Sequence, residues 1–432
     1  MSGSWRRPMY DDADFKRRNL KRNCLSYDEH PSSIETDFEI LSRSEEPKNK
    51  PDTKTILKHL ALFVLTFISV SVVSSIFVGL GNGISTIGPL VLPGTEDLLR
   101  GALFASLLLS FLTFHEFGHY FAAVYHNIKV SLPYYIPLPV GIGTLGAVIR
   151  IKEKIHQTKK LFDIGIAGPI AGFIVSLIVL IVGFATLPEP SHVQNFGGHE
   201  ELKAYVAQTG EYPTEILSQD EGTVLIFGNT ILYGFLASLF DNVPPLWEMY
   251  HYPWLLAGWF GLFFTALNLM PVGQLDGGHI LYSLIGYKNH KIAARIFYSF
   301  ITILAGIELV PFFHDLLGKY DTSFGALSWL IWGIMLFSVM QIAFQKESKW
   351  VSTMFTTSLI CSALYLYVIQ GPQEGSPSLI WGVWTLFITF VVKVEHPPVT
   401  FYTPLSKGRK VIGWLSMLIF ILCISLNPIF TQ

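Results

Sequence analysis

Long apolar runs dominate the chain and predict helices that cross a membrane. A helix needs about 20 consecutive apolar residues to cross the hydrocarbon core of a bilayer. About nine runs reach that length, at 57–80, 98–126, 162–187, 253–283, 292–313, 325–344, 351–370, 378–394 and 411–429. We therefore expect an all-α, polytopic, multi-pass protein of about nine transmembrane helices, embedded in a lipid bilayer.

A further run at 223–240 is a doubtful span, because it is short and contains Asn229. Basic residues help to decide. The N-terminal tail and the segment 127–161 are rich in Lys and Arg, whereas 81–97 contains neither. The positive-inside rule places the tail and 127–161 in the cytoplasm. The later basic loops lie on the same side of the membrane only if 223–240 does not span it. We predict an interfacial or re-entrant helix there. The N-terminus of the chain would then lie inside and its C-terminus outside.

Composition supports a membrane protein and excludes several other classes. Hydrophobic residues make up 50% of the chain, charged residues 14%, and the mean hydropathy is +0.44. The net charge of −2 provides no general attraction to nucleic acid. The three cysteines are scattered and form no CxxC pair, which argues against a disulfide framework and a cysteine-ligated metal.

The distribution of polar segments predicts three parts. Residues 1–54 are polar and mixed in charge, with no cleavable signal peptide, and predict a flexible cytoplasmic tail. Residues 55–290 form a membrane-embedded core with an extracytoplasmic insert at 188–252, and 291–432 form C-terminal transmembrane helices. The insert is short for a complete PDZ domain and lacks a clear set of alternating strands, so we expect none.

The segment 133–152 differs from the helical runs. It contains three prolines and several glycines, which exclude a regular helix, while 148–152 has strand character. A Gly-rich centre between two extended stretches predicts a hairpin. Non-helical backbone at membrane depth must be buried in protein or line a cavity, and an open strand edge there could pair with an extended peptide. An ordinary cytoplasmic hairpin remains an equal alternative.

An HExxH motif lies inside the run 98–126, at His115, Glu116 and His119. Histidines four residues apart share one face of a helix and can bind one zinc ion. Glu116 is placed to accept a proton from a water at that metal. Ionisable groups within a bilayer are costly, so their presence indicates function. The alternatives are a self-satisfied polar cluster or a proton path in a transporter.

Catalytic zinc requires a third protein ligand, and the run 268–279 offers Asp276. Pro271 and three glycines interrupt the helix there, which frees backbone groups and opens space for a substrate. Asp276 would need a partner at membrane depth, and a cation is the natural one, although it could instead cap the helix that follows. His279 could hydrogen-bond to Asp276 or simply be a polar residue on that helix. His396 precedes two prolines that end a helix, and we expect no catalytic role for it.

HEFGH followed by NLMPVGQLDGG resembles the site-2 protease family of intramembrane zinc metalloproteases, in its multi-span branch without a PDZ domain. The family pattern combines HExxH with Asn-x-x-Pro-x-x-x-Leu-Asp-Gly, and the resemblance covers roughly 98–290. It implies one Zn²⁺ per chain bound by His115, His119 and Asp276, with Glu116 as general base. Asn268 would orient the substrate or polarise its carbonyl. The hairpin glycines, Gly141, Gly143 and Gly146, would belong to the element that clamps the substrate as an added strand.

The resemblance implies an integral protein of a bacterial inner or organelle membrane, with its active site toward the cytoplasmic side. Its substrate would be a transmembrane protein cut within or near a membrane-spanning segment, as in regulated intramembrane proteolysis. Two other classes stay open. A metal or proton transporter would also use buried His and Asp but should show an inverted repeat. A non-catalytic membrane scaffold should lack the base or a ligand, and here all four residues are present.

Overall fold

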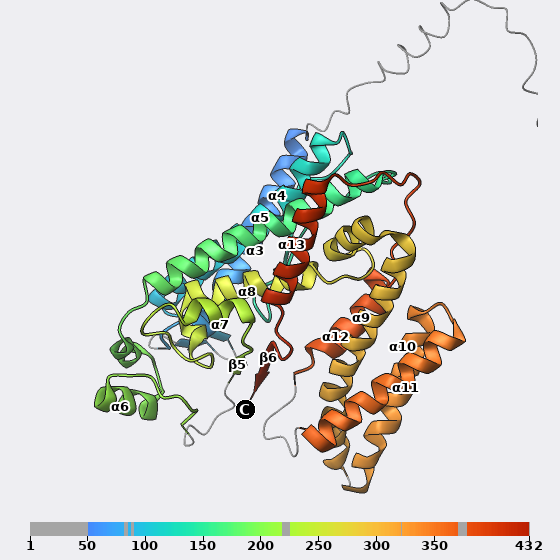
Figure 1. Cartoon of the computed structure of the whole chain (residues 1–432). Helices are drawn as coiled ribbons and strands as arrows, with labels where there is room; N and C mark the ends of the chain where they lie inside the picture. The colour runs from blue at the N-terminus through green and yellow to red at the C-terminus, as the bar shows by residue number, and fades with distance from the viewer. Residues whose placement is uncertain are drawn as a thin grey trace, which may run out of the picture. The chain divides into compact units, whose positions relative to one another are not determined.

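The computed structural model describes residues 51–81, 85–87, 90–217, 225–320, 322–369 and 378–431. The predicted tail at 1–54 lies outside the described residues except for 51–54, where Thr53 already begins helix α3. Asp52 caps that helix, because its side chain accepts a hydrogen bond from the backbone N–H of Thr55 at 3.1 Å. Figure 1 shows the helical elements that follow.

The described chain is mainly α-helical. The α-helices are α3 (Thr53–Val78), α4 (Thr95–Tyr125), α5 (Thr158–Ala185), α6 (Glu200–Thr209), α7 (Ile231–Ala237), α8 (Pro253–Asn268), α9 (Asp276–Gly318), α10 (Ser328–Ala343), α11 (Ser348–Leu364), α12 (Ile380–Phe387) and α13 (Lys407–Cys423). Short 3₁₀ turns are η1 (Pro190–Asn195), η2 (Met249–His251) and η3 (Thr322–Leu327), and π turns are η4 (Tyr365–Ile369) and η5 (Ile388–Val392). The strands are β1 (Ser85–Ile87), β2 (Leu90–Leu92), β3 (Tyr134–Pro137), β4 (Thr144–Val148), β5 (Leu225–Phe227) and β6 (Ile429–Thr431), paired as three two-stranded antiparallel sheets.

The prediction of about nine transmembrane helices is not confirmed. Among the described residues, 6 helices are long and apolar enough to cross a membrane: α3, α4, α5, α9, the helix that includes α10, and α11 continued by η4. The expected span 253–283 is divided, because α8 ends at Asn268 and α9 begins at Asp276. The run 223–240 forms β5 and the 7-residue α7, which is too short to span, as the charge pattern predicted.

The helices that carry the HExxH motif and Asp276 pack closely against their neighbours. Helix α4 packs between α3 and α5, and α5 also contacts α8 and α9 (Figure 1). Glycines allow these approaches: a β-carbon at Gly172 of α5 would lie 2.8 Å from the Phe111 ring of α4, and one at Gly258 would lie 2.5 Å from Leu180. Membrane helices associate through such small residues because lipid offers no hydrophobic driving force between them.

The predicted hairpin is present, with β3 antiparallel to β4. Its second strand lies at 144–148, earlier than the expected 148–152. An isolated bridge between Val130 and Ile151, with backbone hydrogen bonds from Ser131 to Arg150 and from Lys152 to Lys129, extends the pairing. Gly141 and Gly143 take positive φ values of 64° and 86° in the connecting turn. The hairpin packs on α4, where Tyr135 Oη lies 2.8 Å from Thr113 Oγ1.

The C-terminal part of the chain packs back on the core. The buried Arg295 of α9 pairs with Glu347, before α11, and with Glu395, after η5. Just beyond α12, the carbonyl of Val394 accepts a hydrogen bond of 2.9 Å from the backbone N–H of Gly273. The segment that follows η5 therefore lies directly against the loop between α8 and α9.

Candidate metal centre

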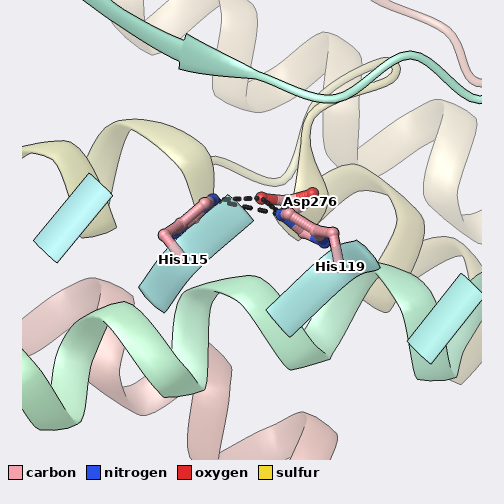
Figure 2. Close-up of side chains that lie close together, drawn as sticks. All are labelled: His115, His119 and Asp276. Atoms are coloured by element: carbon pink, nitrogen blue, oxygen red, sulfur yellow. Dashed lines mark hydrogen bonds and ion pairs between the residues drawn. The ribbon is translucent and has the colours of Figure 1, made fainter. Parts of the chain in front are cut away.

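Helix α4 presents His115 and His119 on one face, as their spacing predicts. Both are buried, with 3% and 6% of their surface exposed, and Glu116 beside them is 7% exposed. Asp276 reaches the same point from the first residue of α9. Figure 2 shows the two imidazole rings and the carboxylate pointing toward one another. Helices distant in sequence thus bring two nitrogens and a carboxylate together in the interior.

The three side chains form a compact triangle of donor atoms. The Nε2 atoms of His115 and His119 lie 3.1 Å apart, and Asp276 Oδ2 lies 3.4 Å from the first and 3.2 Å from the second. Two atoms bound to one tetrahedral zinc at about 2.0–2.2 Å lie roughly 3.3 Å apart. The observed separations match that value, so the donor set fits a single zinc ion with one open coordination position.

Hydrogen bonding fixes the tautomer of His119. Its Nδ1 lies 2.7 Å from the carbonyl oxygen of Ile164 on α5, and a carbonyl can only accept, so Nδ1–H is the donor. In the neutral ring this leaves the lone pair of Nε2 directed at Asp276 and His115. A backbone carbonyl that orients a ligating histidine in this way is a common feature of metal sites.

Helix α5 leaves room for the cluster through three glycines at helical spacing, Gly165, Gly168 and Gly172. A β-carbon at Gly168 would overlap His119 Nε2, and one at Gly172 would lie 3.1 Å from His115 Nδ1. The third, Gly165, faces the β-carbon of His279 at 2.9 Å. Sequence analysis missed this role of α5, although small residues three and four apart in an apolar helix are a recognised sign of close packing.

Asp276 lies at N1 of α9, one position beyond the N-cap residue Leu275. The contacts of its carboxylate are with the two histidines rather than with a cap, which favours the metal-binding alternative. The loop before it is tightly folded. Gly273 has a φ of 51°, and a β-carbon there would overlap the carbonyl oxygen of Lys393. The interruption predicted around Pro271 is therefore real, and C-terminal backbone supports it.

The other predicted residues lie around this centre. The Glu116 carboxylate is within hydrogen-bonding reach of the backbone N–H of Ile149, immediately after β4, so the hairpin contacts the HExxH helix. Asn268 is half-buried at the last position of α8. Among the hairpin glycines, a β-carbon at Gly143 would overlap the Val70 backbone of α3, whereas Gly141 and Gly146 have nothing within 4 Å.

His279 and His396 form a contact that the sequence did not reveal. His279 Nδ1 lies 2.8 Å from His396 Nε2, and the His396 ring packs 4.3 Å from that of Tyr282. Since Nδ1 of His396 faces the Pro397 carbonyl, it is the donor there, and its Nε2 accepts from His279. His396, four residues beyond η5, thus binds a side chain one turn beyond Asp276.

Comparisons with known proteins find relatives that are named as zinc metalloproteases. Residues 103–307 match the model of peptidase family M50. The chain is 28% identical over 256 residues to the probable zinc metalloprotease EGY1, chloroplastic, of Arabidopsis thaliana, covering 56% of this chain and 42% of the relative. It is 30% identical over 246 residues to the protein of that name from Oryza sativa subsp. japonica, covering 52% and 37%. The aligned part therefore spans less than half the length of these relatives. No solved structure matches the chain.

Proposed function

Since residues 103–307 match the model of peptidase family M50, the site-2 protease family, we propose that the chain is an intramembrane zinc metalloendopeptidase. It would hydrolyse peptide bonds within or near transmembrane segments of other membrane proteins. The observation that carries the proposal is the convergence of His115, His119 and Asp276 on one point between apolar helices, with Glu116 beside them. Its helices that could cross a membrane make the protein an integral membrane protein.

His115, His119 and Asp276 would hold the zinc ion that the family implies. Zinc in such a site supplies Lewis acidity, which activates water and polarises a peptide carbonyl. The protein contributes a fixed donor triangle, because Ile164 orients one histidine and Gly168 keeps α5 from filling the site. A position left open by three protein ligands is typical of catalytic rather than structural zinc.

Glu116 would act as the general base and then as the general acid. Its carboxylate would take a proton from the attacking water and pass it to the leaving amine. The side chain is buried, so little bulk water competes for it. Asn268, at the end of the helix that precedes the Asp276 loop, would orient the substrate carbonyl.

The β3–β4 hairpin would bind the substrate as an extended strand. A peptide bond inside an intact helix is shielded by its hydrogen bonds, so the substrate must unwind before attack, and a strand edge can replace those bonds. Leu145 and Val148 of β4 are 68% and 48% exposed and would offer apolar contacts to the substrate. Gly141 and Gly146 have open space above them for a close approach, while Gly143 fixes the turn on α3.

The basic loops support an orientation with the N-terminus and the active site toward the cytoplasmic or stromal side. The positive segment 127–161 directly follows the HExxH helix. The HExxH motif lies in the last third of α4, close to that segment. Water would then enter from this side.

The deciding experiment compares membranes that contain the wild-type chain with membranes that contain Glu116→Gln. We expect Glu116→Gln to retain zinc. Single-pass membrane proteins that the wild type cleaves should remain uncut in membranes that contain this variant. His115→Ala and Asp276→Ala should lose both zinc and cleavage. Continued proteolysis by Glu116→Gln would contradict the proposed mechanism. An unchanged zinc content in Asp276→Ala would show that Asp276 is not a zinc ligand.

A further inference from the structure

A second group of metal-binding side chains lies in the insert 188–252, away from the HExxH motif. His199, Glu248 and His251 each place one potential ligand atom within 4.8 Å of the others. His199 precedes α6, Glu248 precedes η2, and His251 ends η2. Arg100, near the start of α4, donates a hydrogen bond to the carbonyl of His251, so the group lies at the opposite end of α4 from HExxH.

His251 is held in one orientation. Its Nδ1 lies 3.1 Å from the carbonyl oxygen of Gly79, directly after α3, and must be the donor in that bond. The Phe196 ring stacks on the imidazole at a centroid distance of 4.2 Å. In the neutral ring, Nε2 therefore carries a lone pair in a fixed direction, which is the arrangement that Ile164 imposes on His119 in the HExxH site.

His199 faces both other members of the group. Its Nδ1 lies 3.1 Å from Glu248 Oε1, and its Nε2 lies 3.2 Å from His251 Nε2. The Tyr250 hydroxyl is also 3.4 Å from that Nε2. A carboxylate can only accept from Nδ1–H, so the neutral His199 ring also directs a lone pair from Nε2 toward His251. Two facing lone pairs at this distance leave a position between them that a metal cation or a proton can occupy.

Two of the three side chains are buried, since Glu248 is 1% exposed and His251 is 6% exposed. Buried ionisable groups in proteins are paired or bind metals. Two histidines and a carboxylate are a donor set that zinc prefers, and the Nε2–Nε2 separation is close to the roughly 3.3 Å of two ligands on one tetrahedral zinc.

We propose that His199, Glu248 and His251 form a second divalent-metal site of the zinc class in the insert. Bound metal would join the segment before α6 to the turn before α8, and through Gly79 and Arg100 to the adjacent ends of α3 and α4. The site would thus stabilise the insert on the helices that carry the HExxH centre. Its competing explanation is a protonated His199 that donates to both Glu248 and His251.

Metal content of the purified full-length chain separates these explanations. The protein is treated with a chelator and reloaded with Zn²⁺, and the zinc bound per chain is then measured by elemental mass spectrometry. We expect about two Zn²⁺ per chain in the wild type and about one in His199→Asn. Asparagine suits this position because His199 has a φ of 57°, which Asn tolerates better than most residues. His192→Asn, a neighbouring histidine outside the group, is the control and should retain both ions.

A second measurement isolates the new site from the HExxH centre. The double variant His115→Ala/His119→Ala should still bind about one Zn²⁺, and that ion should raise its apparent unfolding temperature. Adding His199→Asn should abolish both effects. Two results would overturn the proposal in favour of the protonated pair. One is a folded double variant that binds no Zn²⁺, and the other is an equal zinc content in the wild type and in His199→Asn. Neither result depends on proteolysis, so failure here would leave the proposed function intact.

Discussion

Gly168 of α5 lies directly against the ring of His119 on α4, and a β-carbon at position 168 would overlap the Nε2 atom. The donor nitrogen thus occupies a space that any other residue type at position 168 would fill. Helix α5 supplies no predicted ligand, yet it defines the cavity through Gly168 and orients His119 through the Ile164 carbonyl. The metal centre therefore depends on three helices, not only on the two that carry the motifs.

Gly168→Ala should displace the His119 ring and weaken the zinc site. We expect zinc affinity to fall by at least about tenfold, with cleavage falling in parallel, since displaced supporting residues commonly cost this much. Competition with a metal-binding dye measures the affinity. Gly333→Ala is the matched control, because a β-carbon there, also inside a helix, meets nothing within 4 Å. Equal affinity in the two variants would contradict the role of Gly168.

Gly273→Ala should disturb the loop that delivers Asp276. Its β-carbon would overlap the Lys393 carbonyl, and its φ of 51° disfavours a side chain. We expect loss of zinc and of cleavage. Gly286→Ala provides the comparison, because its φ of 78° imposes similar backbone strain but its β-carbon meets open space. If both variants lose zinc to the same degree, backbone strain rather than contact with the C-terminal segment is responsible.

Arg409→Gln should loosen α13 from the core. Arg409 Nε and Nη2 bind the two carboxylate oxygens of Asp163 on α5 at 2.7 Å and 2.9 Å. Loss of such a partly buried, charge-assisted pair should lower the free energy of unfolding by about 1–3 kcal/mol. Thermal unfolding in detergent measures the change, with the exposed Lys407→Gln as control. The same apparent unfolding temperature in both variants would show that the pair contributes nothing to stability.

Acidification should destabilise the contact between His396 and α9. Burial lowers the pKa of His396 to about 4, from an ordinary value of 6.5. The folded state therefore binds fewer protons than the unfolded state, so this stability is complete above pH 6.5 and is lost as pH falls toward 4. The ring faces His279, His290 and Tyr282 of α9, and Glu395 precedes it.

The loss attributable to His396 should be about 2 kcal/mol between pH 7 and pH 5. His396→Asn removes the titrating group, so the variant should lose less stability than the wild type over this interval. His314→Asn, at an exposed histidine of α9, should behave as the wild type does. An identical pH dependence in His396→Asn and wild type would assign the effect to other groups.

Local pattern was sufficient for several elements and insufficient for others. The spacing of His115 and His119 placed them on one helix face, and the prolines and glycines of 133–152 predicted the hairpin. The count of about nine spans was not confirmed, and hydropathy does not detect where a long apolar run breaks. Between Asn268 and Asp276 the chain leaves the helix, and contacts with Lys393 and Val394, distant in sequence, help to stabilise that irregular backbone.

By itself the sequence predicted which side chains would carry the proposed chemistry, because a metal-binding motif constrains residue type and local spacing. It also determined the membrane setting, since the bilayer fixes how long an apolar run must be. Only the tertiary structure decided how Asp276 reaches the two histidines, why α5 must carry glycine opposite them, and that His396 lies beside the centre. These relationships involve residues far apart along the chain that meet through packing. Packing depends on how side chains from distant segments fit together in three dimensions, which local sequence patterns do not specify.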